Sequence, residues 1–288
     1  MNWIADSYAK INLGLHVLER LPTGYHRIET GLLPIEWSDR FEISESDRYQ
    51  LELTDSKIPA GDENLITKAY RAFEQYIGLH RHYRFTVQKQ IPAGAGLGGG
   101  SSNAALVLRF LNKVEDVGLN QEDLSDLCRN LGSDIPFFLQ SQPAIASGMG
   151  HDLHPVDIQT DCWIVTLYPG FESSTADAYR NCEPKPNPEF SIQSTLESEP
   201  VDEWRFLLEN DLEHPVISRY EQIGHCKDQM YEFGALFAAM SGSGSSVFGF
   251  FEQDFVALQA YQAFLDLGME VNMTRPGFSP DTGIYRAD

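Results

Sequence analysis

The 288-residue chain has few cysteines and no long apolar run. Its four cysteines, at positions 128, 162, 182 and 226, form no CxxC pair and no spacing typical of a metal site, so we expect reduced thiols and no disulfide. No uncharged apolar segment approaches the length of a membrane span, and the N-terminal residues lack the charged start and apolar body of a signal peptide. These absences predict a cytoplasmic protein.

Basic residues are also scarce. Lysine and arginine total 21 against 42 aspartates and glutamates, which gives a formal net charge of −21. Nucleic acids and anionic membranes both require a basic surface, so neither is expected as a partner. If the substrates are anionic, the few cations must gather around the site, which draws attention to Lys10, His26 and Lys89.

Glycine is concentrated in residues 91–105, IPAGAGLGGGSSNAA, where five glycines fall within seven positions. Glycines let backbone N–H groups approach phosphate oxygens, and the positive end of a following helix attracts the same anion. An apolar stripe at residues 104, 107, 108 and 111 predicts that helix, and Ser101 or Ser102 is suited to be its N-cap. Before the loop, the spacing of Phe85 and Val87 predicts a strand. The segment is typical of a nucleotide triphosphate site.

Three other interpretations of these glycines are weaker. Gly94, Gly96 and Gly99 match the GxGxxG pattern of dinucleotide-binding proteins, but the acid near position 115 follows a helical pattern rather than the required second strand. Gly100 occupies the lysine position of a Walker A loop, and no lysine follows it closely. A surface loop without a ligand is the third alternative.

Elsewhere, helical and strand patterns mix without strict alternation, which predicts an α+β fold rather than a doubly wound sheet. Residues 8–17 alternate as a strand with Lys10 and Asn12 on one face, and a break is expected near 149–157. Residues 183–203 are expected to form a loop or a partly ordered insertion. The other expected strands are 41–43, 49–53, 163–168, 236–240, 247–251 and 270–274, and the other expected helices are 64–76, 121–131, 204–210, 217–233 and 255–267.

Three segments together resemble the motifs of the GHMP kinases (galactokinase, homoserine kinase, mevalonate kinase and phosphomevalonate kinase). They are Ala9 to Leu13 (AKINL), the glycine loop, and Met240 to Phe248 (MSGSGSSVF), in the family's order. The resemblance implies ATP bound by a loop without a Walker lysine, Mg²⁺, and a two-lobed α+β fold with the active site in the cleft between the lobes. We expect lobes at 1–152 and 153–288, and leave open the return of the last strand to the N-terminal lobe.

The resemblance also assigns the catalytic groups. From the residues alone, Asp134 in the segment GSDIPFF is more typical of a turn or N-cap aspartate, and Lys10 of a solvated lysine. The family pattern implies instead that Asp134 orients or deprotonates the acceptor hydroxyl and that Lys10 balances the developing charge. Ser101 and Ser102 are candidates for the Mg²⁺ ligand. The remaining implied ATP-binding residues are Asn64, Leu65, Lys89, Pro92, Gly94, Gly96, Leu97, Gly98, Gly99, Gly100 and Asn103.

The segment Thr23 to His26 (TGYH) is similar to members that phosphorylate a hydroxyl of a cytidine diphosphate derivative in isoprenoid precursor synthesis. The implied substrate residues are Asn12, Tyr25, His26, Thr175 and Tyr179, with aromatic rings available to stack on a cytosine. Glu172 departs from the pattern by adding a negative charge near an anionic substrate. The alternatives are a homoserine or mevalonate type of kinase, a non-catalytic nucleotide-binding protein, or an oxidoreductase. We expect a monomer or a weak homodimer.

Overall fold

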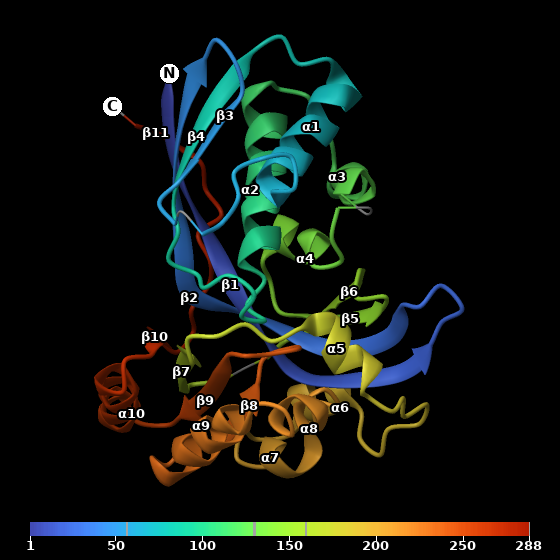
Figure 1. The fold of residues 1–288 in the computed structure, drawn as a ribbon, viewed down its shortest axis with the longest axis vertical. Helices are drawn as coiled ribbons and strands as arrows, with labels where there is room; N and C mark the ends of the chain where they lie inside the picture. The colour runs from blue at the N-terminus through green and yellow to red at the C-terminus, as the bar shows by residue number, and fades with distance from the viewer. Residues whose placement is uncertain (56, 129–130, 159, 288) are drawn as a thin grey trace.

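The computed structural model describes residues 1–55, 57–128, 131–158 and 160–287, which form two β-sheets with helices packed on them (Figure 1). The first sheet has the order β11-β1-β2-β4-β3, with β5 paired to β2 and to β6. β3 runs parallel to β4, and the other pairs are antiparallel. The strands are β1 (Asn2–Arg20), β2 (His26–Ser46), β3 (Gln50–Leu53), β4 (His82–Gln88), β5 (Ala144–Gly148), β6 (Asp152–Pro155) and β11 (Tyr285–Ala287).

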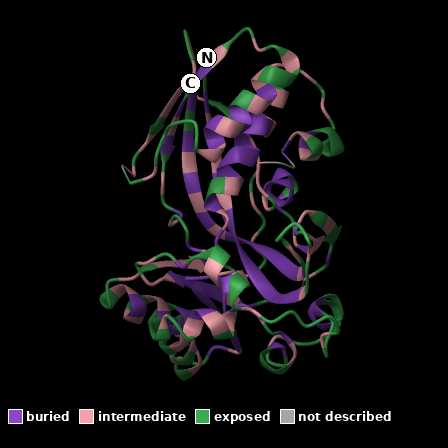
Figure 2. Ribbon diagram, turned by 45° about the vertical axis from the view of Figure 1, so that its right-hand side comes forward, coloured by how far each residue is buried: buried purple, intermediate pink, exposed green. Residues whose placement is uncertain are grey.

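β1 and β2 form a long hairpin that extends from the first sheet into the other half of the molecule (Figure 1). The expected strand at 8–17 is confirmed within β1, but the expected strand at 41–43 is only a part of β2. β2 is longer because it pairs with β1 along nearly its whole length, with register shifts beside Tyr8, Leu13 and Val17. Much of the hairpin is buried (purple in Figure 2), so its inward side chains belong to the cores of both halves.

Four helices cover one face of the first sheet: α1 (Leu65–Ile77), α2 (Gly99–Val114), α3 (Gln121–Cys128) and α4 (Ile135–Gln140). Asn64 caps α1 by accepting a hydrogen bond from the N–H of Ile66. The prediction that Ser101 or Ser102 caps α2 is wrong, because the N-cap is Gly98 in the left-handed conformation. The expected helix 121–131 ends at Cys128 among the described residues, and positions 129 and 130 lie outside them.

The second sheet has the order β10-β7-β9-β8 and is antiparallel throughout. The structure confirms the expected strands at 163–168, 236–240, 247–251 and 270–274. The expected helix 217–233 is instead interrupted at Tyr220, whose backbone angles, φ −128° and ψ 76°, are not helical. Residues 183–203 contain one helix, α6 (Ile192–Ser198), and otherwise consist of loops and turns. The elements are β7 (Trp163–Tyr168), β8 (Phe237–Met240), β9 (Val247–Phe251), β10 (Glu270–Thr274), α5 (Thr175–Arg180), α6 (Ile192–Ser198), α7 (Trp204–Leu207), α8 (Glu213–Ile217), α9 (Glu221–Glu232) and α10 (Asp254–Asp266).

The two halves are joined by backbone contacts as well as by the chain. Leu15 of β1 donates its N–H to Glu209 O at 2.8 Å, and Asp211 donates to Leu15 O at 2.9 Å. β11 returns to pair with β1, and β6 crosses the expected division at 152/153. The fold is therefore α+β, as predicted. Among the described helices, none has the length and apolar character that a membrane crossing requires.

Candidate active site

The glycine loop is held between the two halves of the molecule. Gly94, Gly96 and Gly98 have φ values of 63°, 78° and 70°, a region in which residues with a β-carbon are strained. A β-carbon on Gly96 would collide with Ser241 O. Ser241 Oγ donates to Gly96 O at 2.9 Å, and Ser246 N donates to Ala95 O at 3.1 Å. The segment 240–248 therefore supports the loop from the opposite half.

The start of α2 leaves backbone donors free for an anion. Gly98 has no side chain to cap the helix, and the first N–H groups of a helix have no partner within it. They open into a pocket of about 660 Å³ between α1, α2 and the loop. Of the predicted ATP-binding residues, eleven line this pocket: Asn64, Leu65, Lys89, Pro92, Gly94, Gly96, Gly98, Gly99, Gly100, Ser101 and Asn103.

Two predicted ATP-binding residues do not line the pocket. Leu97 is buried, and its carbonyl accepts the N–H of Lys10 at 3.0 Å. Ser102 is buried as well, and its Oγ accepts a hydrogen bond from Ser7 Oγ at 2.7 Å. Of the two candidate metal-binding serines, only Ser101 lines the pocket.

Asp39, which the sequence did not single out, fixes the strand before the loop. It is fully buried, and its carboxylate accepts the N–H groups of Gln90 and Ile91 at 2.8 and 2.9 Å. It also accepts from Asn103 Nδ2 at 2.8 Å and pairs with the ammonium of Lys89. Lys89 is thus bound to a buried carboxylate at the pocket wall. No short-range pattern marks Asp39, because its partners are distant in sequence.

Lys10 and Asp134 lie together where the two halves meet. The Lys10 ammonium is buried and lies 3.5 Å from Asp134 Oδ2, 2.6 Å from Asn12 Oδ1 and 3.1 Å from Gly96 O. Asp134 occupies the N-cap position of α4, but its side chain makes no capping hydrogen bond. Its carboxylate is therefore free to face the ammonium, with about a third of the side chain exposed.

The predicted base-binding residues are only partly assembled. His26, at the start of β2, stacks on Tyr179 of α5 with ring centroids 5.1 Å apart. Burial raises the pKa of Tyr179, and the charge of Asp134 adds to this rise. Tyr25 is 68% exposed and is not packed against them. Thr175 lines the same pocket as the glycine loop and hydrogen-bonds Ser243 at 2.8 Å.

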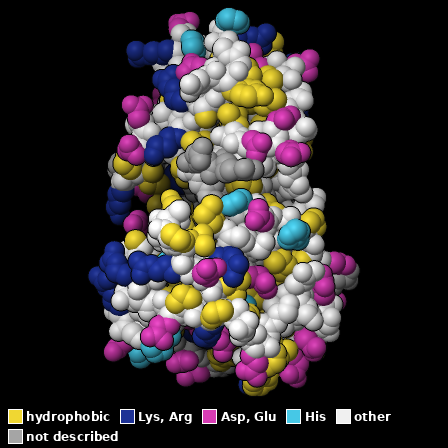
Figure 3. All heavy atoms as spheres, turned by 90° about the vertical axis from the view of Figure 1, so that its right-hand side faces the viewer, with side chains coloured by type: hydrophobic (Ala, Val, Ile, Leu, Met, Phe, Trp, Pro, Cys, Tyr) yellow, Lys and Arg dark blue, Asp and Glu magenta, His cyan; other side chains and the backbone are white. Residues whose placement is uncertain are grey.

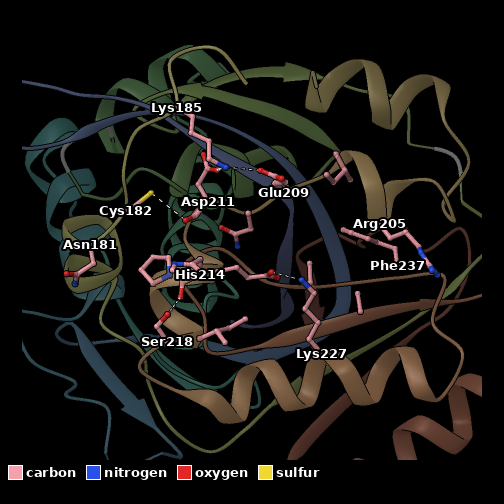
Figure 4. Close-up of a pocket in the computed structure, with 18 of the residues that line it drawn as sticks. Asn181, Cys182, Lys185, Arg205, Glu209, Asp211, His214, Ser218, Lys227 and Phe237 are labelled. Carbon is pink, nitrogen blue, oxygen red and sulfur yellow. Dashed lines mark hydrogen bonds and ion pairs between the residues drawn. The ribbon is translucent and has the colours of Figure 1, made fainter. Parts of the chain in front are cut away.

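A second pocket, of about 1030 Å³, lies in the half built on the second sheet (Figure 4). Its lysines are paired with acids, Lys185 with Glu209 and Asp211, and Lys227 with Glu213. The adjoining Asn210 donates to Met240 O at 3.0 Å and to Gly242 O at 2.8 Å, and Glu213 accepts the N–H of Met240 at 2.8 Å. This pocket wall therefore anchors the segment that supports the glycine loop.

On the face shown in Figure 3, lysine and arginine side chains gather in a band just below mid-height, whereas acids are more widely spread. The net charge of −21 is thus not uniform over the surface. A glycine loop with free backbone donors, a pocket at a helix start and a lysine beside a carboxylate together form the arrangement expected of an ATP-dependent small-molecule kinase.

Comparisons with known proteins give the family. A family model described as "GHMP kinases N terminal domain" matches residues 64–142, and one described as "GHMP kinases C terminal" matches residues 196–268. A 4-diphosphocytidyl-2-C-methyl-D-erythritol kinase of Pelodictyon phaeoclathratiforme is 37% identical over 280 residues, which cover 96% of this chain and 97% of the relative. One of Parabacteroides distasonis is 40% identical over 247 residues, with 85% and 90% covered.

Solved structures of GHMP kinases are similar to this chain as well. A crystal structure of 4-(cytidine 5'-diphospho)-2C-methyl-D-erythritol kinase matches with a TM-score of 0.81 and 31% identity, covering 96% of this chain and all of that one. A homoserine kinase from Cytophaga hutchinsonii matches with a TM-score of 0.73 at 14% identity, which shows a shared fold. The chain belongs to the GHMP kinase family, and it is an ATP-dependent kinase acting on a small-molecule alcohol.

Proposed function

We propose that this chain phosphorylates the 2-hydroxyl of 4-diphosphocytidyl-2-C-methyl-D-erythritol with ATP, a step in non-mevalonate isoprenoid precursor synthesis. The observation that carries the proposal is the stack of the His26 and Tyr179 rings. The charge of Asp134, the ion-pair partner of Lys10, acts on Tyr179. A kinase with a small acceptor has no base for these rings to hold. Similarity to relatives of that name over nearly the full chain supports the same substrate.

In the proposed reaction, the acceptor hydroxyl lies between the Asp134 carboxylate and the γ-phosphoryl group of ATP in the loop pocket. The hydroxyl oxygen forms a bond to the γ-phosphorus, its proton passes to Asp134, and the bond from the γ-phosphorus to the β,γ-bridging oxygen breaks to release ADP. The Lys10 ammonium stabilises the negative charge that develops on the transferred group. Asn12, bonded to Lys10 and to Thr30, keeps that ammonium in place.

We propose that Tyr25, His26 and Tyr179 bind the cytosine, and that His26 does so as a neutral imidazole. Burial lowers the pKa of His26 below its ordinary value of 6.5, and Arg20 lowers it further. A neutral imidazole offers one donor and one acceptor to the edge of a base. The stack of His26 on Tyr179 must open by the thickness of one ring to admit the cytosine between them.

Mg²⁺ fits this site as an ion carried in with ATP. Among the described residues, no group of three or more His, Cys, Asp or Glu side chains is arranged to hold a metal. Mg²⁺ is commonly held by one or two protein oxygens and by phosphates, and the Ser101 hydroxyl at the pocket wall is such an oxygen. Bound there, Mg²⁺ would neutralise phosphate charge. Ser102 is not proposed as its ligand, because its hydroxyl is buried against Ser7.

We further propose that this enzyme has two lobes divided near residues 152/153, with β6 and β11 both belonging to the first lobe, and that it is a cytoplasmic monomer or weak homodimer. The pairing of β11 with β1 supports the return of the last strand to the first lobe. Light scattering over a range of protein concentrations tests the oligomeric state, since a weak homodimer gains mass with concentration.

Release of ADP tests the proposed function when it is followed with 4-diphosphocytidyl-2-C-methyl-D-erythritol, homoserine and mevalonate as acceptors. We expect turnover with the first and not with the other two. The substrate assignment would be overturned by a kcat/KM for homoserine or mevalonate that equals or exceeds the kcat/KM for 4-diphosphocytidyl-2-C-methyl-D-erythritol. Absence of ATP binding would overturn the kinase assignment itself.

A further inference from the structure

Glu172, in the loop between β7 and α5, lies against the glycine loop. A β-carbon built on Gly94 would be 2.5 Å from Glu172 Cδ and 2.8 Å from its Oε2. The carboxylate therefore covers the face of Gly94 from which a side chain would project. Gly94 lines the proposed ATP pocket and Glu172 does not, so a negative charge lies directly against one residue of a site that should receive a triphosphate.

The backbone on both sides of Glu172 is held firmly. The carbonyl of Phe171 accepts a hydrogen bond from the Ser245 hydroxyl, and the Ser173 hydroxyl donates a hydrogen bond to Ser243 O. Both serine partners belong to the segment 240–248, which also supports Gly96 and Ala95. The position of Glu172 over the loop is therefore set by the same contacts that build the loop.

No lysine, arginine or histidine among the described residues forms an ion pair with Glu172, and no side-chain hydrogen bond to it is seen there. Its charge is thus not cancelled by a neighbouring cation. Free N–H groups and positive helix ends attract any anion. The Glu172 carboxylate next to the loop already carries a negative charge before a phosphate group binds. A triphosphate entering the pocket meets like charge, which weakens its binding.

We propose that Glu172 tunes nucleotide affinity: its carboxylate competes electrostatically with the phosphates of ATP and ADP for the glycine loop. The inference rests on the proposed ATP site. Since the repulsion acts on both nucleotides, Glu172 favours release of ADP as well as weakening capture of ATP. The residue acts through charge and touches no reacting atom, so it is a residue that sets affinity rather than a catalytic one.

Calorimetric titration of the full chain with nucleotide tests this proposal. Glu172→Gln is expected to tighten ATP binding about threefold to tenfold at low salt, because a nearby exposed charge contributes on this scale. The gain should diminish from ATP to ADP to AMP and vanish for adenosine, and it should shrink at about 0.5 M salt, where charges are screened. Glu232→Gln, the same charge change at the end of α9, should alter none of these affinities.

The outcomes separate this proposal from the proposed function. If the parent chain binds ATP and Glu172→Gln binds it equally or more weakly, the tuning role is wrong while the kinase assignment stands. An equal gain for adenosine, or a gain seen only in Glu172→Ala, would show a steric effect and would overturn the electrostatic proposal. Failure of the parent chain to bind ATP would instead contradict the proposed function.

Discussion

The Lys10 ammonium and the Asp134 carboxylate are 3.5 Å apart, although one comes from β1 and the other from the start of α4. The ammonium is buried, and a β-carbon on Gly98 would lie 3.2 Å from Lys10 Cε and 2.7 Å from Phe138 Cζ. The loop that is proposed to hold ATP thus packs directly on the lysine. Lys10 therefore contacts both the loop that is proposed to bind phosphate and the residue that is proposed as the base.

Asp134→Asn should lower kcat about a hundredfold to ten-thousandfold, the usual contribution of a general base, and leave the KM for ATP nearly unchanged. The stability should also stay close to that of the parent, because the side chain makes no capping bond. ADP release and thermal unfolding measure these effects. A variant with unchanged kcat would show that Asp134 is not the base.

Lys10→Met should cost a similar factor in kcat, because it removes the cation that balances developing charge. The double variant of Lys10 and Asp134 should be hardly slower than the slower single variant, because groups that act as a unit are not additive. Single-turnover rates for the four proteins provide the comparison. Fully multiplicative losses would indicate that the two residues act independently.

Asp39→Ala should lower the free energy of unfolding by about 3–5 kcal/mol, since it leaves the Lys89 ammonium and two backbone N–H groups without their acceptor. Asp39→Asn should be less damaging because it keeps an acceptor oxygen. Denaturant unfolding measures both. If the two variants were equally stable, the hydrogen bonds of Asp39 would not account for its burial.

The sequence predicted the glycine loop because the chemistry of that loop is contiguous. It predicted β7, β8 and β9 of the second sheet because each is a short run of mostly buried residues. It did not predict Asp39 or Asn210, whose partners are far away in the chain. It also placed the N-cap of α2 at Ser101 or Ser102 from residue preference, whereas the N-cap is Gly98, about one helical turn earlier, where the loop packs against Phe138. Tertiary contacts decided these positions.

Gly96→Ala should destabilise the chain by about 1–3 kcal/mol, because it combines a left-handed φ with a collision at Ser241 O. Gly100→Ala is the matched control. Its φ is not left-handed, and a β-carbon there would lie an ordinary 3.5 Å from Leu65 Cδ1, so its stability should stay within about 0.5 kcal/mol of the parent. Thermal unfolding distinguishes the two. Equal tolerance at both positions would contradict the close approach of the two loops.

Tyr179→Ala should raise the KM for the cytidine diphosphate acceptor about tenfold, on the scale of one base stacked on one ring, and leave the KM for ATP unchanged. Tyr179→Phe keeps the ring and should retain the affinity. Initial rates at varied acceptor and fixed saturating ATP give the values. A loss of equal size in Tyr179→Phe would assign the role to the hydroxyl instead of the ring.

His26 should make folding stability depend on pH on the acid side. Its pKa in the folded chain is below the ordinary value of 6.5, first because of burial and then because of Arg20. Between these two pKa values the unfolded chain binds more protons, so this contribution is complete above pH 6.5 and is lost as the pH falls below it. Thermal unfolding at pH 5.5 and 7.5 should therefore show a smaller acid destabilisation for His26→Gln than for the parent. An identical acid destabilisation in both proteins would mean that other groups account for it.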